Sequence, residues 1–233
     1  MLDGVQLAEL REGVRADDFL MSLLSERGRR VVEEIIDHDA FPGSTDPAAL
    51  ALVAALIRTV RPTRMLQLGT HIGFSAVYLG DVLAPEGGHL VTVEPDVVAL
   101  GIARKFVDDA GLADSVQFIQ GFSTDHPVHA RLLQEGPFDL VYLDSSHAYA
   151  ATLVELELIF DGAWLAKDGL LILHDAARTA AAFDPTGEGG VPRALDEWVK
   201  ARADDVQSFV LEPPLWPCAC GLGLVTRLGA RTP

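Results

Sequence analysis

Short apolar segments alternate with helical segments along the chain from Arg64 onward. The short segments are apolar almost throughout, which is typical of strands buried on both faces of a parallel sheet. Five such strands are predicted, at Met65–Gly69, His89–Glu94, Val116–Gly121, Phe138–Asp144 and Leu170–Asp175. The segments between them predict helices at Ser75–Leu83, Asp96–Ala110, His126–Gln134 and Ala148–Leu165. The alternation therefore predicts an α/β fold with a doubly wound, mostly parallel sheet.

The beginning of the chain has a different, purely helical pattern. Apolar residues at helical spacing predict one helix over Asp17–Ile36 and a second over Ala48–Val60. Asp46 is expected to cap the second helix, and Pro47 suits its first turn. These apolar helices are also a candidate surface for a homodimer.

The end of the chain departs from the alternation as well. After a predicted helix at Val191–Arg202, the apolar segments Val206–Leu211 and Gly221–Arg227 are joined by a connection too short for a crossover helix. We expect them to pair as an antiparallel hairpin at the edge of the sheet. With a helical lead over residues 1–60 and an α/β core over 61–233, the chain is predicted to form one domain.

Composition narrows the function classes. The formal charge of −16 and the pI near 4.7 disfavour a nucleic-acid-binding surface, since such affinity comes mainly from Lys and Arg. No apolar run approaches the roughly 20 residues that span a bilayer, and acidic residues stand where a signal peptide would be basic, so a cytoplasmic location is expected. Cys218 and Cys220 imply no disulfide framework and, without a second cluster, make a poor zinc site.

Polar residues and glycines gather where the predicted strands end. Ligands of parallel sheets bind beyond the carboxyl ends of the strands, so we expect these residues to line one crevice. Gly69 and Gly73 allow a tight turn before a helix whose free N–H groups face a ligand, and Glu94 is placed to hold a ribose diol. The five strand ends supply Gly69-Thr70-His71, Glu94-Pro95-Asp96, Gly121-Phe122-Ser123, Asp144-Ser-Ser-His147 and His174-Asp175.

In the residues at these five strand ends, and in their order along the chain, the sequence resembles the class I S-adenosylmethionine-dependent methyltransferases. The resemblance is specifically to the small O-methyltransferase group that includes catechol O-methyltransferase. The resemblance covers nearly the whole chain and implies a seven-stranded, Rossmann-like sheet with an antiparallel C-terminal hairpin. Its motifs occur in family order: Leu68-Gly-Thr-His-Ile-Gly-Phe-Ser75, Glu94, Gly121-Phe-Ser123, Tyr142-Leu-Asp-Ser-Ser-His-Ala-Tyr149, Lys167-Asp-Gly-Leu-Leu-Ile-Leu-His-Asp175 and Gly221-Leu-Gly-Leu-Val-Thr-Arg227.

The resemblance implies how S-adenosyl-L-methionine would be bound. Glu94 would hold both ribose hydroxyls, and Asp144 would lie close to the sulfonium. The glycine turn would pack against the methionine part and the residues after the third strand would border the adenine, so the predicted cofactor residues are Gly69, Thr70, His71, Gly73, Ser75, Glu94, Pro95, Gly121, Phe122, Ser123 and Asp144. One departure is Gln67, because the family usually has an acid at this position.

Methyl transfer requires alignment of the reactants and removal of the nucleophile's proton. Asp144 and Asp175 end strands that should be neighbours, so they could share a divalent cation, most simply Mg²⁺, and His174 as a third ligand would favour Mn²⁺. The family's third protein ligand falls at Ala176, which offers no donor atom. The alternative is a metal-independent enzyme in which His147 or His174 is the general base. Asp144, His147 and His174 are therefore the candidate catalytic residues.

The acceptor is expected to be a small hydroxylated molecule, with Trp216 and Phe183 as candidate contacts.

Two further functions remain open. An acid after the second strand also suits the ribose of a nicotinamide cofactor, so an NAD-dependent oxidoreductase is one. Gln67 and Ala176 keep open a non-catalytic, cofactor-binding subunit.

Overall fold

The structure, a computed structural model, describes residues 4–229, so Met1 to Asp3 of the predicted helical lead and residues 230–233 of the predicted core lie outside it. Within this range there are seven strands: β1 (Arg64–Leu68), β2 (His89–Glu94), β3 (Val116–Gln120), β4 (Phe138–Leu143), β5 (Leu165–His174), β6 (Val206–Leu211) and β7 (Leu222–Arg227). In the sheet they follow the order β3-β2-β1-β4-β5-β7-β6. The pairs β5–β7 and β6–β7 are antiparallel. The predicted α/β fold is confirmed.

Residue contacts divide the described chain into two compact units, which are considered one at a time. The first comprises the chain up to Thr63 together with Thr70–Gly121, and the second comprises Arg64–Gly69 together with the chain from Phe122 onward.

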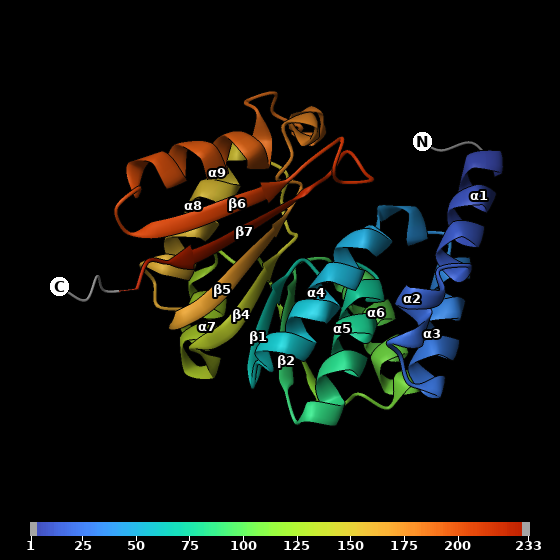
Figure 1. Ribbon diagram of the computed structural model, residues 1–233. Helices are drawn as coiled ribbons and strands as arrows, with labels where there is room; N and C mark the ends of the chain where they lie inside the picture. The colour runs from blue at the N-terminus through green and yellow to red at the C-terminus, as the bar shows by residue number, and fades with distance from the viewer. Residues whose placement is uncertain (1–3, 230–233) are drawn as a thin grey trace. The chain divides into compact units, whose positions relative to one another are not determined.

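In the first unit, helices pack around a parallel pair of strands. β2 pairs with β3 from Leu90 opposite Val116 to Glu94 opposite Gln120, and its bounds are those predicted. Figure 1 shows α4, α5 and α6 next to one another, and α5 and α6 both contact β2. The helical segments of this unit are α1 (Gly4–Arg15), α2 (Asp18–Ser22), α3 (Glu26–Asp37), η1 (Phe41–Gly43), α4 (Pro47–Val60), α5 (Phe74–Leu83), η2 (Ala84–Glu86) and α6 (Val97–Ala110).

The single helix predicted over residues 17–36 is wrong, because the chain forms α2 and α3 there. Ser25 separates them: its backbone is extended and its hydroxyl accepts a hydrogen bond from the N–H of Gly28 at 3.0 Å, which caps α3. The predicted cap of α4 is confirmed, since Asp46 accepts from the N–H of Ala49 at 2.9 Å. Helix α1 lies within the predicted helical lead, although its bounds were not predicted separately.

In the second unit, five strands form a mixed sheet. β1 pairs with β4 and β4 with β5 in parallel, whereas β7 lies antiparallel between β5 and β6. Figure 1 shows the β6–β7 hairpin beside β5, as predicted, and α8 against α9. The helical segments here are α7 (His126–Glu135), α8 (Tyr149–Phe160), η3 (Arg178–Phe183) and α9 (Gly190–Ala201).

The helix predicted over Ala148–Leu165 ends earlier than expected, at Phe160. Leu165 is instead the first residue of β5, which therefore starts five residues before the predicted Leu170. Trp164 lies in the connection and is fully buried, with its indole 5.4 Å from the His129 ring. A buried tryptophan in a loop gives the same apolar pattern as one on a helix, which explains the error.

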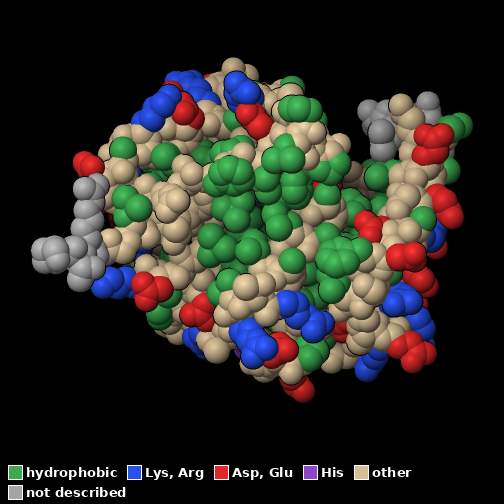
Figure 2. All heavy atoms as spheres, viewed as in Figure 1, with side chains coloured by type: hydrophobic (Ala, Val, Ile, Leu, Met, Phe, Trp, Pro, Cys, Tyr) green, Lys and Arg blue, Asp and Glu red, His purple; other side chains and the backbone are tan. Residues whose placement is uncertain are grey.

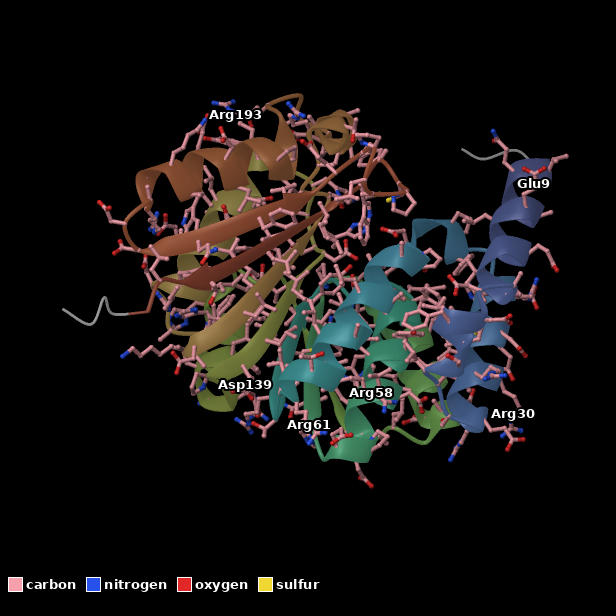
Figure 3. The ribbon with its side chains drawn as sticks, viewed as in Figure 1. Glu9, Arg30, Arg58, Arg61, Asp139 and Arg193 are labelled. Atoms are coloured by element: carbon pink, nitrogen blue, oxygen red, sulfur yellow. The ribbon has the colours of Figure 1, made fainter. Side chains whose placement is uncertain are left out.

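Polar side chains join α8 to α9 at the surface of the second unit. The guanidinium of Arg193, labelled in Figure 3, lies 4.3 Å from the centre of the Tyr149 ring. The Tyr149 hydroxyl donates to Glu197 at 2.5 Å, and Arg193 donates to the same carboxylate at 2.8 Å. These contacts hold the helix that begins near the end of β4 in a fixed position.

The surface of the second unit carries apolar side chains over β6 and β7, visible in Figure 2. Phe209 on β6 is 60% exposed and Leu215 in the following loop is 75% exposed. Among the described residues, no helix has the length and apolar character needed to cross a membrane. Cys218 and Cys220 are both half-buried and form no disulfide bond.

Candidate active site

The first unit contains the second half of the glycine loop, which we define as Gly69–Gly73. Gly73 has φ +93° and precedes α5, and a Cβ there would lie 2.9 Å from the backbone of Ala103, so only glycine fits. The hydroxyl of Thr70 contacts that of Thr92 at 2.5 Å. Ser75 is buried in the first turn of α5. The sequence thus places a helix N-terminus directly after a tightly held turn.

Glu94 holds this loop through its carboxylate. The N–H groups of Thr70 and His71 donate to Glu94 Oε2 at 3.1 and 2.7 Å, and the N–H of Asp96 donates to Oε1 at 3.0 Å. Asp96 itself accepts from the first amides of α6, so its role is that of a helix cap. The Glu94 side chain is therefore oriented by three backbone donors and fixes the shape of the loop.

The other predicted cofactor residues of the first unit are His71, Pro95 and Gly121. His71 has φ +50°, and its ring packs against Gly43, where a Cβ would lie 3.0 Å from the imidazole. The N–H of Gly121 donates to the carbonyl of Glu94 at 3.1 Å, and Pro95 is exposed beside it. The loop and the ends of β2 and β3 are thus joined within this unit.

The second unit contains the start of the glycine loop. Gly69 has φ +92°, and a Cβ there would lie 2.0 Å from the carbonyl oxygen of Asp144, so the close approach of the two segments requires glycine. The side-chain amide of Gln67 is fully buried and donates to the carbonyl of Gly69 at 2.8 Å. A carboxylate has no hydrogen to donate, so the amide fits this position in a way that the family's usual acid cannot.

Four predicted residues come together at the ends of β4 and β5, and we call them the acid–histidine cluster: Asp144, His147, His174 and Asp175. His174 Nδ1 lies 3.3 Å from Asp144 Oδ1 and 3.0 Å from Asp175 Oδ2. His147 Nδ1 lies 3.0 Å from the same Asp175 oxygen. Parallel pairing explains the convergence, because Leu143 and Leu173 stand opposite each other just before the acids. Asp175 adopts φ +58°, an unusual conformation for a side chain larger than glycine.

The charges of the cluster reinforce each other. Burial alone would lower the pKa of His174, but the Asp144 carboxylate, Tyr142 and the hydrogen bonds to both acids hold that pKa well above its ordinary value. The hydrogen bond to Asp175 raises the pKa of His147. Burial opposes ionisation of Asp175, yet hydrogen bonds from both imidazoles depress its pKa. A protonated imidazole neither accepts a proton nor binds a metal, so either role requires that the proton leave first.

A buried acid that the sequence analysis missed is hydrogen-bonded to Ser145, the residue that follows Asp144. Glu155 on α8 is only 2% exposed and accepts hydrogen bonds from Ser123 at 2.5 Å and from Ser145 at 2.8 and 2.7 Å. Burial raises the pKa of Glu155, although both serines favour its ionised form. Phe122, next to Ser123, is 62% exposed. The signal in the sequence was weak, because Glu155 is one of two glutamates, with Glu157, on an otherwise apolar helix.

The candidate acceptor contacts differ in their surroundings. The ring of Phe183 lies 6.3 Å from that of His147, edge to face, so Phe183 borders the acid–histidine cluster. Trp216 is half-buried in the loop between β6 and β7. Ala176 is buried and contributes no donor, as expected from its side chain.

Comparison with known proteins gives three consistent results. Residues 66–176 match a family described as a methyltransferase domain. The chain is 30% identical to a catechol O-methyltransferase of Mycobacterium tuberculosis over 179 residues, which cover 63% of this chain and 80% of that protein. It is 32% identical to a catechol O-methyltransferase of Niastella koreensis over 104 residues. That match covers 44% of this chain and 46% of the relative, so the chain spans less than half of the relative's length.

Solved structures show the same fold. An O-methyltransferase from Bacillus cereus, in complex with SAH, superimposes with a TM-score of 0.72 at 17% identity, covering 95% of this chain and all of that one. The O-methyltransferase TomG from Streptomyces achromogenes, in complex with SAM, gives a TM-score of 0.68 at 18% identity, covering 98% of this chain and 100% of that one.

Proposed function

Because the chain belongs to the catechol O-methyltransferase group of S-adenosylmethionine-dependent methyltransferases, we propose that it transfers the methyl group of S-adenosylmethionine to a hydroxyl group of a small molecule. One observation carries this proposal most directly: Asp144, His147, His174 and Asp175 meet within hydrogen-bond distance at the ends of two parallel strands. The reaction requires protein groups that hold the acceptor's hydroxyl in place or remove its proton. This reaction is favoured over the nicotinamide-dependent alternative by the family assignment.

We propose that the cofactor is held by the residues named from the sequence. Glu94 is suited to the ribose hydroxyls because its carboxylate is already oriented by three backbone N–H groups. The glycine loop and Ser75 would hold the methionine part beside the N-terminus of α5, where backbone donors favour a carboxylate. His71, Pro95, Gly121, Phe122 and Ser123 would border the nucleoside. Asp144 would lie towards the sulfonium.

We propose that a divalent cation assists the reaction at Asp144, Asp175 and His174. The donor set supports this, since one oxygen of each acid lies within 3.3 Å of the same imidazole nitrogen and the three groups therefore converge. The sequence predicts Mg²⁺ or Mn²⁺ for such oxygen and nitrogen donors. A bound cation would lower the pKa of a coordinated substrate hydroxyl. His147 and Phe183 would then border the acceptor.

A metal-independent route is supported by the contact between His147 and Asp175. A carboxylate that accepts from one imidazole nitrogen orients the ring and stabilises its protonated form, which is the arrangement of a general base. The His147 side chain is 47% exposed, so an acceptor can reach it, whereas His174 is 6% exposed. His147 is therefore the better candidate base of the two.

An activity assay separates these routes. The full chain would be incubated with methyl-labelled S-adenosylmethionine and a panel of catechols, other phenols and aliphatic alcohols, after dialysis against EDTA and again with added Mg²⁺, Mn²⁺ or Zn²⁺. Metal-assisted transfer predicts activity that returns only with an added ion, whereas a His147 base predicts activity that EDTA leaves intact and His147→Gln abolishes. Absence of label transfer to every acceptor under all conditions would contradict the proposed function and favour a non-catalytic role.

A further inference from the structure

A cysteine from a distant part of the sequence joins the acid–histidine cluster. One sulfur atom of Cys220, one ring nitrogen of His174 and one carboxylate oxygen of Asp175 all lie within 4.8 Å of one another. His174 and Asp175 are buried and Cys220 is half-buried. Sulfur, nitrogen and oxygen donors thus meet at one point within the second unit.

The fold fixes this meeting point through the antiparallel pairing of β5 and β7. His174 stands opposite Leu222, so the residues just after β5 and just before β7 must lie together. The N–H of Ala177 donates to the carbonyl of Cys220 at 2.9 Å, and Gly221 has φ +67°, where a Cβ would lie 2.5 Å from that of Ala177. The backbone on both sides is therefore held before any ligand binds.

We propose that His174, Asp175 and Cys220 bind a zinc-type divalent ion. Ligand atoms of tetrahedral zinc lie about 3.3–3.8 Å apart, because Zn–N and Zn–O bonds are about 2.0–2.2 Å and Zn–S bonds about 2.3 Å. The three donor atoms lie within 4.8 Å of one another, so each pair needs to close by no more than about 1.5 Å. Three protein ligands leave a fourth position for water or a substrate oxygen.

The sulfur changes which metal the site selects. Thiolates favour zinc and other borderline or soft ions, whereas Mg²⁺ prefers oxygen donors in an octahedral arrangement. Cys220 thus supplies, from the other strand, the third donor that Ala176 does not provide. The inference rests on the proposed function only where it places the ion beside the methyl acceptor. Binding of the ion depends on the side chains of His174, Asp175 and Cys220 alone.

The second cysteine provides a matched control. Cys218 lies two residues before Cys220 and its sulfur accepts a hydrogen bond from the N–H of Cys220 at 3.3 Å. Its sulfur lies within 4.8 Å of that of Cys220 but does not belong to the group formed with His174 and Asp175. The two cysteines differ little in exposure, chemistry or position in the loop. If the metal is held as we propose, replacing Cys220 should weaken metal binding and replacing Cys218 should not.

The test is a metal titration of the reduced full chain and of its Cys220→Ser and Cys218→Ser variants, each dialysed against EDTA. Co²⁺ is added as a spectroscopic probe, and bound Zn²⁺ is counted by mass spectrometry after gel filtration in excess Mg²⁺. We expect one ion per chain and a near-ultraviolet thiolate-to-cobalt band in the wild type and in Cys218→Ser. Cys220→Ser should lose the band and bind Zn²⁺ at least about tenfold more weakly.

Three results would overturn the inference: no thiolate band in the wild type, equal loss in both serine variants, or displacement of Zn²⁺ by Mg²⁺. Circular dichroism of the same samples shows that each variant is folded, and calorimetry with S-adenosylhomocysteine tests the proposed function separately. A wild type that binds Zn²⁺ through Cys220 but not S-adenosylhomocysteine would retain the metal site and contradict the methyltransferase assignment.

Discussion

The buried carboxyl of Glu155 should make the stability of the protein fall as the pH rises. Its pKa is raised from the ordinary value of 4.5, mainly by burial, so the folded state favours the protonated form. Below pH 4.5 the group is protonated in both states and costs nothing; the cost accumulates as the pH rises through the folded-state pKa and is complete above it. Each unit of elevation corresponds to about 1.4 kcal/mol of unfolding free energy.

Two substitutions separate this charge effect from the hydrogen bonds. In Glu155→Gln the amide oxygen still accepts from the hydroxyls of Ser123 and Ser145 and the charge is gone, so this variant should be more stable than the wild type at pH 8 and equal to it near pH 4.5. In Glu155→Ala the buried hydroxyl of Ser123 loses its acceptor, whereas the exposed hydroxyl of Ser145 can bond water, so this variant should be about 1–3 kcal/mol less stable than Glu155→Gln.

The assay is urea denaturation followed by tryptophan fluorescence from pH 4.5 to pH 8 for the wild type and both variants. Unfolding free energies of the wild type and Glu155→Gln should diverge as the pH rises above 4.5, until the folded-state pKa of Glu155 is passed. Parallel pH curves for these two proteins would refute the argument, because they would show that the ionisation of Glu155 is not coupled to folding. Glu155→Ala, which also lacks the charge, should lie below Glu155→Gln at every pH, because it alone loses the hydrogen-bond acceptor.

The remaining predictions concern the glycine loop and the acid–histidine cluster. Gly69→Ala should lower the unfolding free energy measured by urea denaturation by about 3 kcal/mol or more, because the new methyl group meets the carbonyl of Asp144. Gly87→Ala, with φ +74° and open space around the glycine, should lower it by about 1 kcal/mol. Equal losses in the two variants would contradict the packing argument. Gln67→Glu should lower the melting temperature by about 4–8 °C through loss of the donor to Gly69, and an unchanged value would show that the bond contributes nothing. Asp175→Asn should reduce kcat at least about 100-fold with S-adenosylhomocysteine binding intact; unchanged kcat would exclude a role for this acid.

The strands were predictable because their signals are local. The bounds of β2 and β6 are those expected from apolar runs, and the remaining strand ends fall within one or two residues of prediction apart from the start of β5. The helix break at Ser25 was missed because a serine inside an apolar helical pattern is ambiguous until its hydroxyl is seen to cap α3. Trp164 misled for a similar reason, since burial in a loop and burial on a helix look alike in sequence.

The cluster was predictable only in part. Asp144 and Asp175 could be placed together, because parallel strands end at one edge of a sheet and their acids follow directly. Cys220 could not be placed beside them, because its position depends on the pairing of β5 with β7. In the sequence, the one possible metal ligand near Cys220 is Cys218. Glu155 is also brought to Ser123 and Ser145 by tertiary packing alone.

The central claim, that this chain binds S-adenosylmethionine through the strand ends, is tested most directly by calorimetry with S-adenosylhomocysteine. The account predicts saturable binding of one molecule per chain by the wild type. It also predicts loss of binding in Glu94→Ala and unchanged binding in Glu9→Ala, an exposed acid on α1. No heat of binding in the folded wild type, or equal affinity in Glu94→Ala, would contradict the account.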